Sequence, residues 1–186
     1  MMYVRTFLPW IVYGVVPSGS WQWGALAALV IAIASIVVQT RAGRGADAMI
    51  IEIGSAVFFA ALTVIAFADP DTGLHSYSAA LANGTLALIS LISLAIRRPF
   101  TLGIAKQTTP REFWDLPEFL KVNMIITSVW AASFVVTAVV LTLIAHAGPD
   151  HVAATVTVQI AGLVVPMVFT VRYVAHVEAK VKALFG

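Results

Sequence analysis

The chain has 186 residues, of which 60% are hydrophobic and only 11% are charged. Soluble globular proteins carry about 25% charged residues, so this composition excludes a soluble domain and predicts a membrane protein. The net charge is only +2 and there is no cysteine, which excludes disulfides, Cys-ligated metals and thiol nucleophiles. The basic residues are too few to predict a nucleic-acid partner, and membrane lipids are the partner that this composition implies.

The first apolar segment, Thr6–Val16, is too short to cross a bilayer as an ordinary helix, which takes about 20 residues. Two interpretations follow. The favoured one is a re-entrant or interfacial segment with its N-terminus outside, which would place Trp10, Trp21 and Trp23 in an aromatic belt at the outer interface. The alternative is a short sixth span that begins inside at Arg5.

Five later apolar runs are each long enough to span the hydrocarbon core as helices. They cover approximately residues 21–40, 48–68, 77–96, 119–145 and 152–171. The sequence therefore predicts an all-α membrane protein, a compact bundle of five transmembrane helices that forms a single domain over residues 1–186.

The basic residues alternate with these runs. Ten of the eleven Lys and Arg residues lie next to those ends of the five predicted helices that share one side of the membrane. The loops 69–76 and 147–151, on the other side, contain none. Basic residues stay on the cytoplasmic side, so we expect a multi-pass protein of the bacterial inner membrane with a cytoplasmic C-terminus. The residues expected to set this topology and to contact lipid headgroups are Arg41, Arg44, Arg97, Arg98 and Arg172.

Residues 97–117 form the predicted cytoplasmic loop with room for a functional surface. Its apolar residues favour a position in the headgroup region. It is either a plain membrane-surface connector or a docking platform for a partner, in which case Arg111, Phe113 and Trp114 are the candidate contact residues.

Glu52 is the strongest candidate for chemistry within a span, because a charged side chain at this depth costs several kcal/mol unless it is paired, protonated or hydrated. Asn123 lies at a comparable depth, and Arg97, Arg98 and Lys121 lie nearby in the predicted topology. Glu52 could be a structural contact with Asn123 or a basic residue, a proton or ligand site, or a side chain that reaches the interface.

Asn123, Thr127 and Trp130 recur at helical spacing and predict one polar and aromatic face of the fourth run. That face either packs inside the bundle or forms the wall of a ligand pocket. Asn83 and Gln159 are expected near the midplane, where they could meet across helices and line a small cavity next to the kink at Pro166.

The outer loops contain His75, His146 and His151 beside Asp69, Asp71 and Asp150. Imidazole and carboxylate groups could hold a transition metal, but their spacing matches no ligand motif, so no metal or cofactor is predicted. The chain also contains no recognisable catalytic motif, and we expect a protein that is not an enzyme.

Four short motifs give the chain a resemblance to a family. They are Phe7-Leu8-Pro9-Trp10, Arg97-Arg98-Pro99-Phe100, Leu120-Lys121-Val122-Asn123 and the aromatic-basic stretch at Phe169–Tyr173. With the order of the hydrophobic segments, they make the chain resemble the intracellular septation protein A (YciB-like) family. The resemblance implies a non-enzymatic inner-membrane protein that acts in septation, elongation and envelope integrity through protein partners.

Three functional hypotheses follow. The first is an interaction protein in envelope maintenance or cell division. The second is a small transporter, channel or lipid-handling protein, which at this size would work as a homo-oligomer, with a cavity near Glu52, Asn123 and Trp130. The third is an accessory subunit of a larger membrane complex.

Overall fold

The computed structural model describes residues 2–16, 20–148 and 151–185, without the side chains at positions 2–5, 47, 181, 182, 184 and 185. Within these residues, five helices are long and apolar enough to cross a membrane. They are α2 (Trp21–Arg41), α3 (Ile50–Ala68), α4 (Ser78–Ala95), α6 (Pro117–Ala147) and α7 (Val152–Phe185). The predicted all-α bundle with five long apolar helices is confirmed.

Shorter helices fill the connections. The α-helices are α1 (Met2–Val15) and α5 (Phe100–Ala105). The 3-10 turns are η2 (Ala46–Ala48), η3 (Gly73–Tyr77) and η4 (Arg111–Phe113). α7 continues as one helix well past the predicted end of its span at residue 171, so the C-terminal residues extend a membrane helix.

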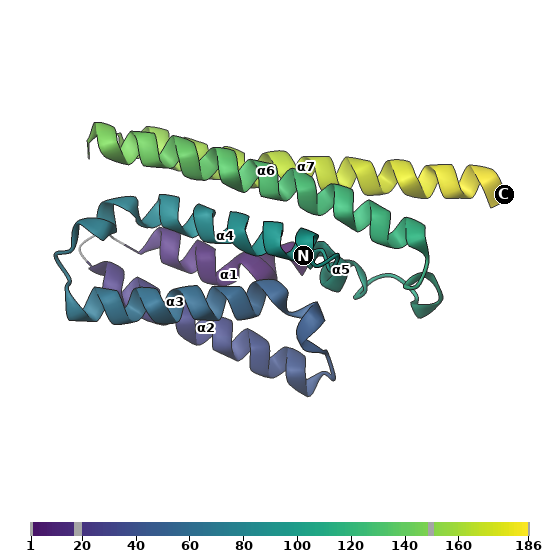
Figure 1. The fold of residues 1–186 in the computed structure, drawn as a ribbon, viewed down its shortest axis with the longest axis horizontal. Coiled ribbons are helices and arrows are strands. Elements are labelled where there is room, and N and C mark those ends of the chain that lie inside the picture. Colours follow the sequence, from purple (N-terminus) through teal and green to yellow (C-terminus); the bar gives the residue numbers. More distant parts are fainter. Residues whose placement is uncertain (1, 17–19, 149–150, 186) are drawn as a thin grey trace.

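The long helices lie nearly parallel in the order α7, α6, α4, α3, α2 (Figure 1). α4 packs on α6 and on α3, and α2 packs on α3. α7 packs on α6 and leaves most of its own surface exposed: only 11% of its most apolar stretch is buried. It is therefore the most loosely attached of the long helices.

α1 packs against α2 and α3 with one of its faces buried. The ring of Phe7 stacks on that of Trp130 in α6 at 5.2 Å, and Tyr13 contacts Phe59 in α3 at 5.6 Å. The hydroxyl of Thr6 reaches Glu52 in the first turn of α3, so α1 starts at the same end of the bundle as α3. This arrangement fits the alternative of a short sixth span, and not the favoured segment on the membrane surface, because the aromatic side chains of α1 supply core packing.

Trp10 accordingly does not join an aromatic belt. Its indole Nε1 donates to Ser55 Oγ at 2.9 Å, and its ring lies 4.7 Å from that of Phe59. Trp21 is buried beside the α3–α4 loop, whereas Trp23 is 59% exposed. An indole can occupy the core when its N–H finds an acceptor, and Ser55 provides that acceptor.

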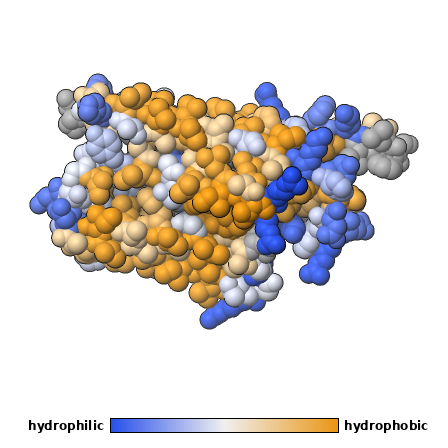
Figure 2. Space-filling model, viewed as in Figure 1, coloured by the Kyte–Doolittle hydropathy of each residue, from blue (hydrophilic) through white to orange (hydrophobic). Residues whose placement is uncertain are grey.

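The face of the molecule in Figure 2 is mostly apolar between two more hydrophilic ends. We name the end that carries the basic residues the basic end, and the end formed by η3 and Gly148 the opposite end. The described basic residues at the basic end are Arg41, Arg44, Arg97, Arg98, Lys106, Arg111, Lys121, Arg172 and Lys180. In a bilayer, the apolar surface between the ends would contact lipid chains.

Two helices finish at the basic end with the same backbone motif. After α2, Gly43 has a φ of 75° and the N–H of Arg44 donates to the carbonyl of Gln39. After α4, Arg97 has a φ of 55° and the N–H of Arg98 donates to the carbonyl of Ser93. Both are left-handed helix caps, but only the first has the glycine that such a cap favours.

Candidate functional site

Glu52 is buried, with 7% of its surface exposed. Its carboxylate Oε1 accepts a hydrogen bond from the Thr6 hydroxyl at 3.4 Å. Among the described side chains, no Lys or Arg forms an ion pair with it, and it makes no hydrogen bond to Asn123. The contact with Asn123 that was considered from the sequence is therefore wrong. Glu52 joins α3 to α1 through Thr6.

Asn123 is used locally. Its amide Nδ2 donates to the carbonyl of Phe119 at 2.8 Å, one turn earlier in α6. Its own carbonyl accepts from the hydroxyl of Thr101 in α5, and that hydroxyl also lies 2.8 Å from Thr127 Oγ1. All three side chains are buried, so these polar groups fasten α5 to the inner face of α6.

Trp130 lies at the centre of the larger hydrophobic cluster and is 1% exposed. Phe7 stacks on its ring, and the rings of Phe134 and Phe100 lie at 5.5 Å and 6.4 Å. Its Nε1 donates to Thr170 Oγ1 in α7 at 3.0 Å. The space that a ligand pocket at Trp130 would need is occupied by Phe7, so in this structure the face of α6 packs against neighbouring helices.

Asn83 and Gln159 do not form the predicted midplane contact. Asn83 is half-buried and its Nδ2 donates to the carbonyl of Ala79 in its own helix at 3.0 Å. Gln159 is half-buried on α7, which packs on α6 and has no extensive contact with α4. The amide of Asn83 satisfies its hydrogen bonding one turn back, which is a common alternative for short polar side chains in helices.

A polar contact that the sequence did not predict compensates for Pro166. A proline has no N–H, so the carbonyl four residues earlier, that of Gly162, loses its partner in the helix. Ser133 of α6 donates its hydroxyl to this carbonyl at 2.8 Å. A Cβ at Gly162 would collide with the side chain of Thr137, so the glycine also sets the close approach of α6 and α7.

The segment after α5 forms an aromatic and cationic surface at the basic end, which we name the Trp114 platform. It consists of Lys106, Arg111, Phe113, Trp114 and Leu116. Lys106 Nζ lies 5.1 Å and Arg111 Cζ 5.6 Å from the centre of the Trp114 ring system. Phe113 and Leu116 are 43% and 44% exposed, so apolar side chains lie beside the two cations.

The Trp114 platform is held in place by a hydrogen bond within the loop and by the packing of α5 against the bundle. Trp114 Nε1 donates to the carbonyl of Thr109 at 2.9 Å. In α5, Phe100 and Ile104 are buried in the core, and Gly103 lies so close to η2 that a Cβ there would come within 2.7 Å of the Ala48 backbone. The platform is thus a fixed surface, because the helix that precedes it is packed against the bundle.

The basic residues expected to set topology are mostly at the surface. Arg41, Arg97, Arg98 and Arg172 are exposed, as expected of side chains that face water or headgroups. Arg44 is half-buried, and its guanidinium donates to Gln39 Oε1 at 2.9 Å.

Asp150 and the side chain of Arg5 lie outside the described part of the chain. Among the side chains that are described, no three His, Asp or Glu residues lie close enough together to hold a metal ion.

Four residues in these contacts were not singled out from the sequence. Thr6 binds Glu52, Thr101 joins α5 to α6, Ser133 satisfies Gly162, and Lys106 covers Trp114. Only Ser133 had a usable signal, because Pro166 in a membrane helix requires a donor from elsewhere for the freed carbonyl.

No protein-family model, no curated protein and no solved structure matches this chain. The resemblance to the intracellular septation protein A family therefore stays a prediction. A function for this chain is therefore inferred from the arrangement of its own residues.

Proposed function

We propose that this is a non-enzymatic, multi-pass protein of the bacterial inner membrane that acts by binding a protein partner through the Trp114 platform, in envelope maintenance or cell division. In this proposal the basic end faces the cytoplasm, because basic residues resist translocation.

The observation that carries the proposal is that Lys106 and Arg111 both lie over the ring of Trp114, beside the exposed Phe113 and Leu116. Tryptophan and arginine with neighbouring apolar side chains are the residues that dominate protein–protein contact energies. Since Gly103 and Ile104 anchor the preceding helix, little conformational entropy is lost when a partner binds.

The same features count against a pocket-based activity at the centre of the bundle. Phe7 covers Trp130, and Glu52 and Asn123 take part in separate contacts. A transporter with a cavity among these three residues would need α1 to leave its place in the core.

The test uses a photo-crosslinking cysteine reagent at Thr108→Cys, an exposed position beside the platform in a chain with no other cysteine. Crosslinked partners are recovered from living cells and compared between variants. Trp114→Ala and Arg111→Ala should each reduce a specific crosslinked species at least about tenfold, the effect of losing a central contact residue.

Arg172→Ala is the matched control, because it removes the same charge from an exposed position on α7 outside the platform. It should leave the crosslinked species unchanged. Normal recovery with Trp114→Ala and Arg111→Ala, or an equal loss with Arg172→Ala, would overturn the assignment of the platform as the docking surface.

A further inference from the structure

Two hollows of opposite chemistry lie on neighbouring sides of η3 at the opposite end of the bundle. The first, the polar hollow, has a volume of about 370 Å³. It is lined by Trp21, Gln22, Pro70, Asp71, Thr72, Gly73, His75 and Ser76. The second, the apolar groove, has a volume of about 460 Å³. It is lined by Leu74, Tyr77, Ala80, Leu81, Gly84, Thr85, Leu88, Ala138 and Thr142.

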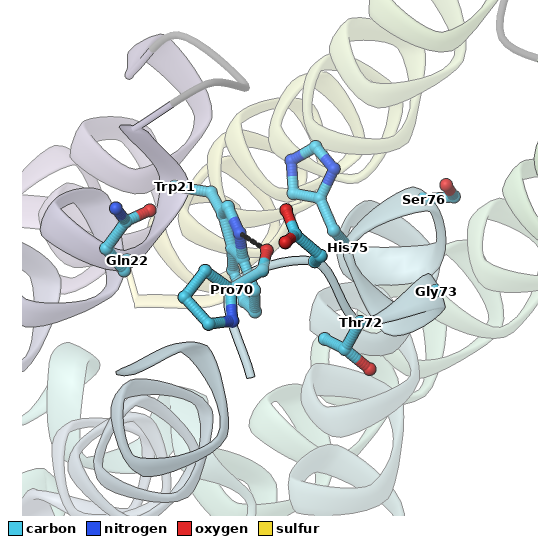
Figure 3. Close-up of a pocket in the computed structure, with 8 residues that line it drawn as sticks. Trp21, Gln22, Pro70, Thr72, Gly73, His75 and Ser76 are labelled. Atoms are coloured by element: carbon cyan, nitrogen blue, oxygen red, sulfur yellow. Dashed lines mark hydrogen bonds between the residues drawn. The ribbon is translucent and has the colours of Figure 1, made fainter. Parts of the chain in front are cut away.

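One side of the polar hollow is formed by Trp21, which a hydrogen bond holds in place. Trp21 is 5% exposed, and its Nε1 donates to the carbonyl of Pro70 at 3.0 Å, which ties the α3–α4 loop to the start of α2. The His75 ring lies 5.3 Å from the Trp21 ring (Figure 3). The loop therefore does not need to be ordered by a ligand, because the buried indole already holds it.

The side chains of the polar hollow suit a ligand that carries a positively charged group next to negatively charged oxygen atoms. Asp71 supplies a carboxylate, and no Lys or Arg occurs anywhere between positions 45 and 96. Thr72, Ser76 and Gln22 add hydroxyl and amide donors. A ligand's ammonium group would form an ion pair with Asp71. Oxygen atoms close to that ammonium in the same ligand would accept hydrogen bonds from the hydroxyl and amide groups of the hollow.

The apolar groove has the length and direction of a lipid chain. Its residues on α4 recur at intervals of three and four, so they form one face of that helix. From Tyr77 to Leu88 this face extends about 16 Å at 1.5 Å per residue, close to the ~15 Å half-thickness of a hydrocarbon core. The groove opens to the outside beside the exposed Leu81 and Leu88.

We propose that this end of the protein binds one phospholipid with a primary ammonium headgroup, with the headgroup in the polar hollow and an acyl chain in the apolar groove. A single phospholipid joins a polar headgroup to an apolar chain, as two hollows lined by residues of the same turn η3 require, whereas a transmembrane helix from a second copy would supply the apolar part alone. The orientation in the proposed function determines only which leaflet supplies the lipid, and this is the outer leaflet if the basic end is cytoplasmic. The lipid site itself does not depend on the Trp114 platform.

The headgroup is tested by native mass spectrometry of the detergent-solubilised full chain mixed with phosphatidylethanolamine, phosphatidylcholine or phosphatidylglycerol of identical acyl chains. Phosphatidylethanolamine should bind most tightly, because its ammonium has N–H donors for Asp71. Asp71→Asn should weaken that binding about tenfold, which corresponds to one charge-assisted hydrogen bond. Asp69→Asn, an exposed carboxylate outside the hollow, should have no effect.

The groove is tested by Gly84→Leu. A Cβ at this position meets no atom within 4 Å, so we expect a leucine to enter the groove without displacing the fold. It should reduce phosphatidylethanolamine binding at least tenfold, and glycerophosphoethanolamine without acyl chains should not compete. Ala61→Leu, at an exposed position on α3 at a similar depth, is the control and should bind lipid normally.

Four outcomes would overturn the proposal. Equal binding of phosphatidylglycerol, or unchanged binding in Asp71→Asn, would remove the ammonium assignment. Full competition by glycerophosphoethanolamine would remove the groove from the site. A dimer that Gly84→Leu dissociates, with lipid binding unaltered, would assign the groove to a second copy of the chain. None of these results depends on whether the Trp114 platform binds a protein.

Discussion

Thr6 and Glu52 lie 46 positions apart in sequence, and the threonine hydroxyl donates to the glutamate carboxylate across the interface of α1 and α3. One turn farther along both helices, Trp10 donates to Ser55. These two contacts fix the register of a short helix that could not remain in the membrane by length alone. Glu52 thus has a structural role that its position in the sequence does not reveal.

Loss of the Thr6 hydroxyl should destabilise the bundle. Thr6→Val keeps the shape of the side chain but leaves the buried carboxylate without this donor, which should lower the free energy of unfolding by about 1–3 kcal/mol. Thr6→Ser keeps the donor and should stay close to the natural protein. Glu52→Gln should be neutral or stabilising, because the amide still accepts and no charge is buried. Thermal unfolding in detergent measures all three, and a Thr6→Val protein as stable as the natural one would contradict the role of this contact.

Ser133→Ala should loosen α7. It leaves the Gly162 carbonyl without its donor next to Pro166, at an expected cost of about 1–3 kcal/mol. Faster cleavage of α7 by a protease in detergent, with α1 to α6 still protected, is the expected readout. Pro166→Ala restores the N–H within α7, so in the double variant Ser133→Ala should cost much less. An equal cost in both backgrounds would show that Ser133 does not compensate for the proline.

Arg97→Gly should stabilise the protein. A non-glycine residue in the left-handed region costs about 1–2 kcal/mol, and Gly43 shows what the equivalent cap at the end of α2 uses instead. The expected gain is about 1 kcal/mol in the free energy of unfolding. Arg98→Gly removes the same charge from a residue without a positive φ and should give no gain. If both variants changed stability equally, charge and not backbone strain would be the cause.

The orientation of the bundle can be measured with single cysteines. Ser76→Cys at the opposite end and Thr108→Cys at the basic end are both exposed in a chain with no native cysteine. A membrane-impermeant maleimide should label Ser76→Cys in intact spheroplasts and Thr108→Cys only after permeabilisation. The reverse pattern would place the basic end outside and move the proposed lipid site to the inner leaflet.

The five long helices could be predicted because length and apolar composition alone decide whether a segment can span a bilayer. α2 begins at Trp21, where the sequence placed it, and α3 begins at Ile50, two positions after its predicted start. Such boundaries follow from local composition, which needs no knowledge of neighbours.

The position of α1 could not be predicted in the same way. Its 14 residues fit either the surface or the interior, and the stacking of Phe7 on Trp130 in α6 decides between them. That contact joins residues more than a hundred positions apart. The same limit applies to Glu52, whose partner Thr6 was one of many hydroxyl residues available.

The amides were misassigned for a local reason. Contacts of Asn123 with Glu52 and of Asn83 with Gln159 were possible from the sequence, but each asparagine donates to the carbonyl four residues earlier in its own helix. A short side chain reaches that carbonyl without any tertiary contact, so the local bond is always available as a competitor. An amide at a predicted helix interface is therefore weak evidence for a polar site.

The attachment of α7 has a consequence for synthesis. The buried residues of both hydrophobic clusters, Phe7 to Phe134, precede α7 in the chain. Chains emerge N-terminus first and fold in that order, so the core can assemble while the last helix is still in the ribosome. α7 then adds to a finished surface on which Ser133 and Trp130 are already in position. We therefore expect its insertion to be a late, separate step in biogenesis, and truncation before Val152 to remove from the larger hydrophobic cluster only the partly buried residues that α7 packs against it, such as Leu163 and Tyr173.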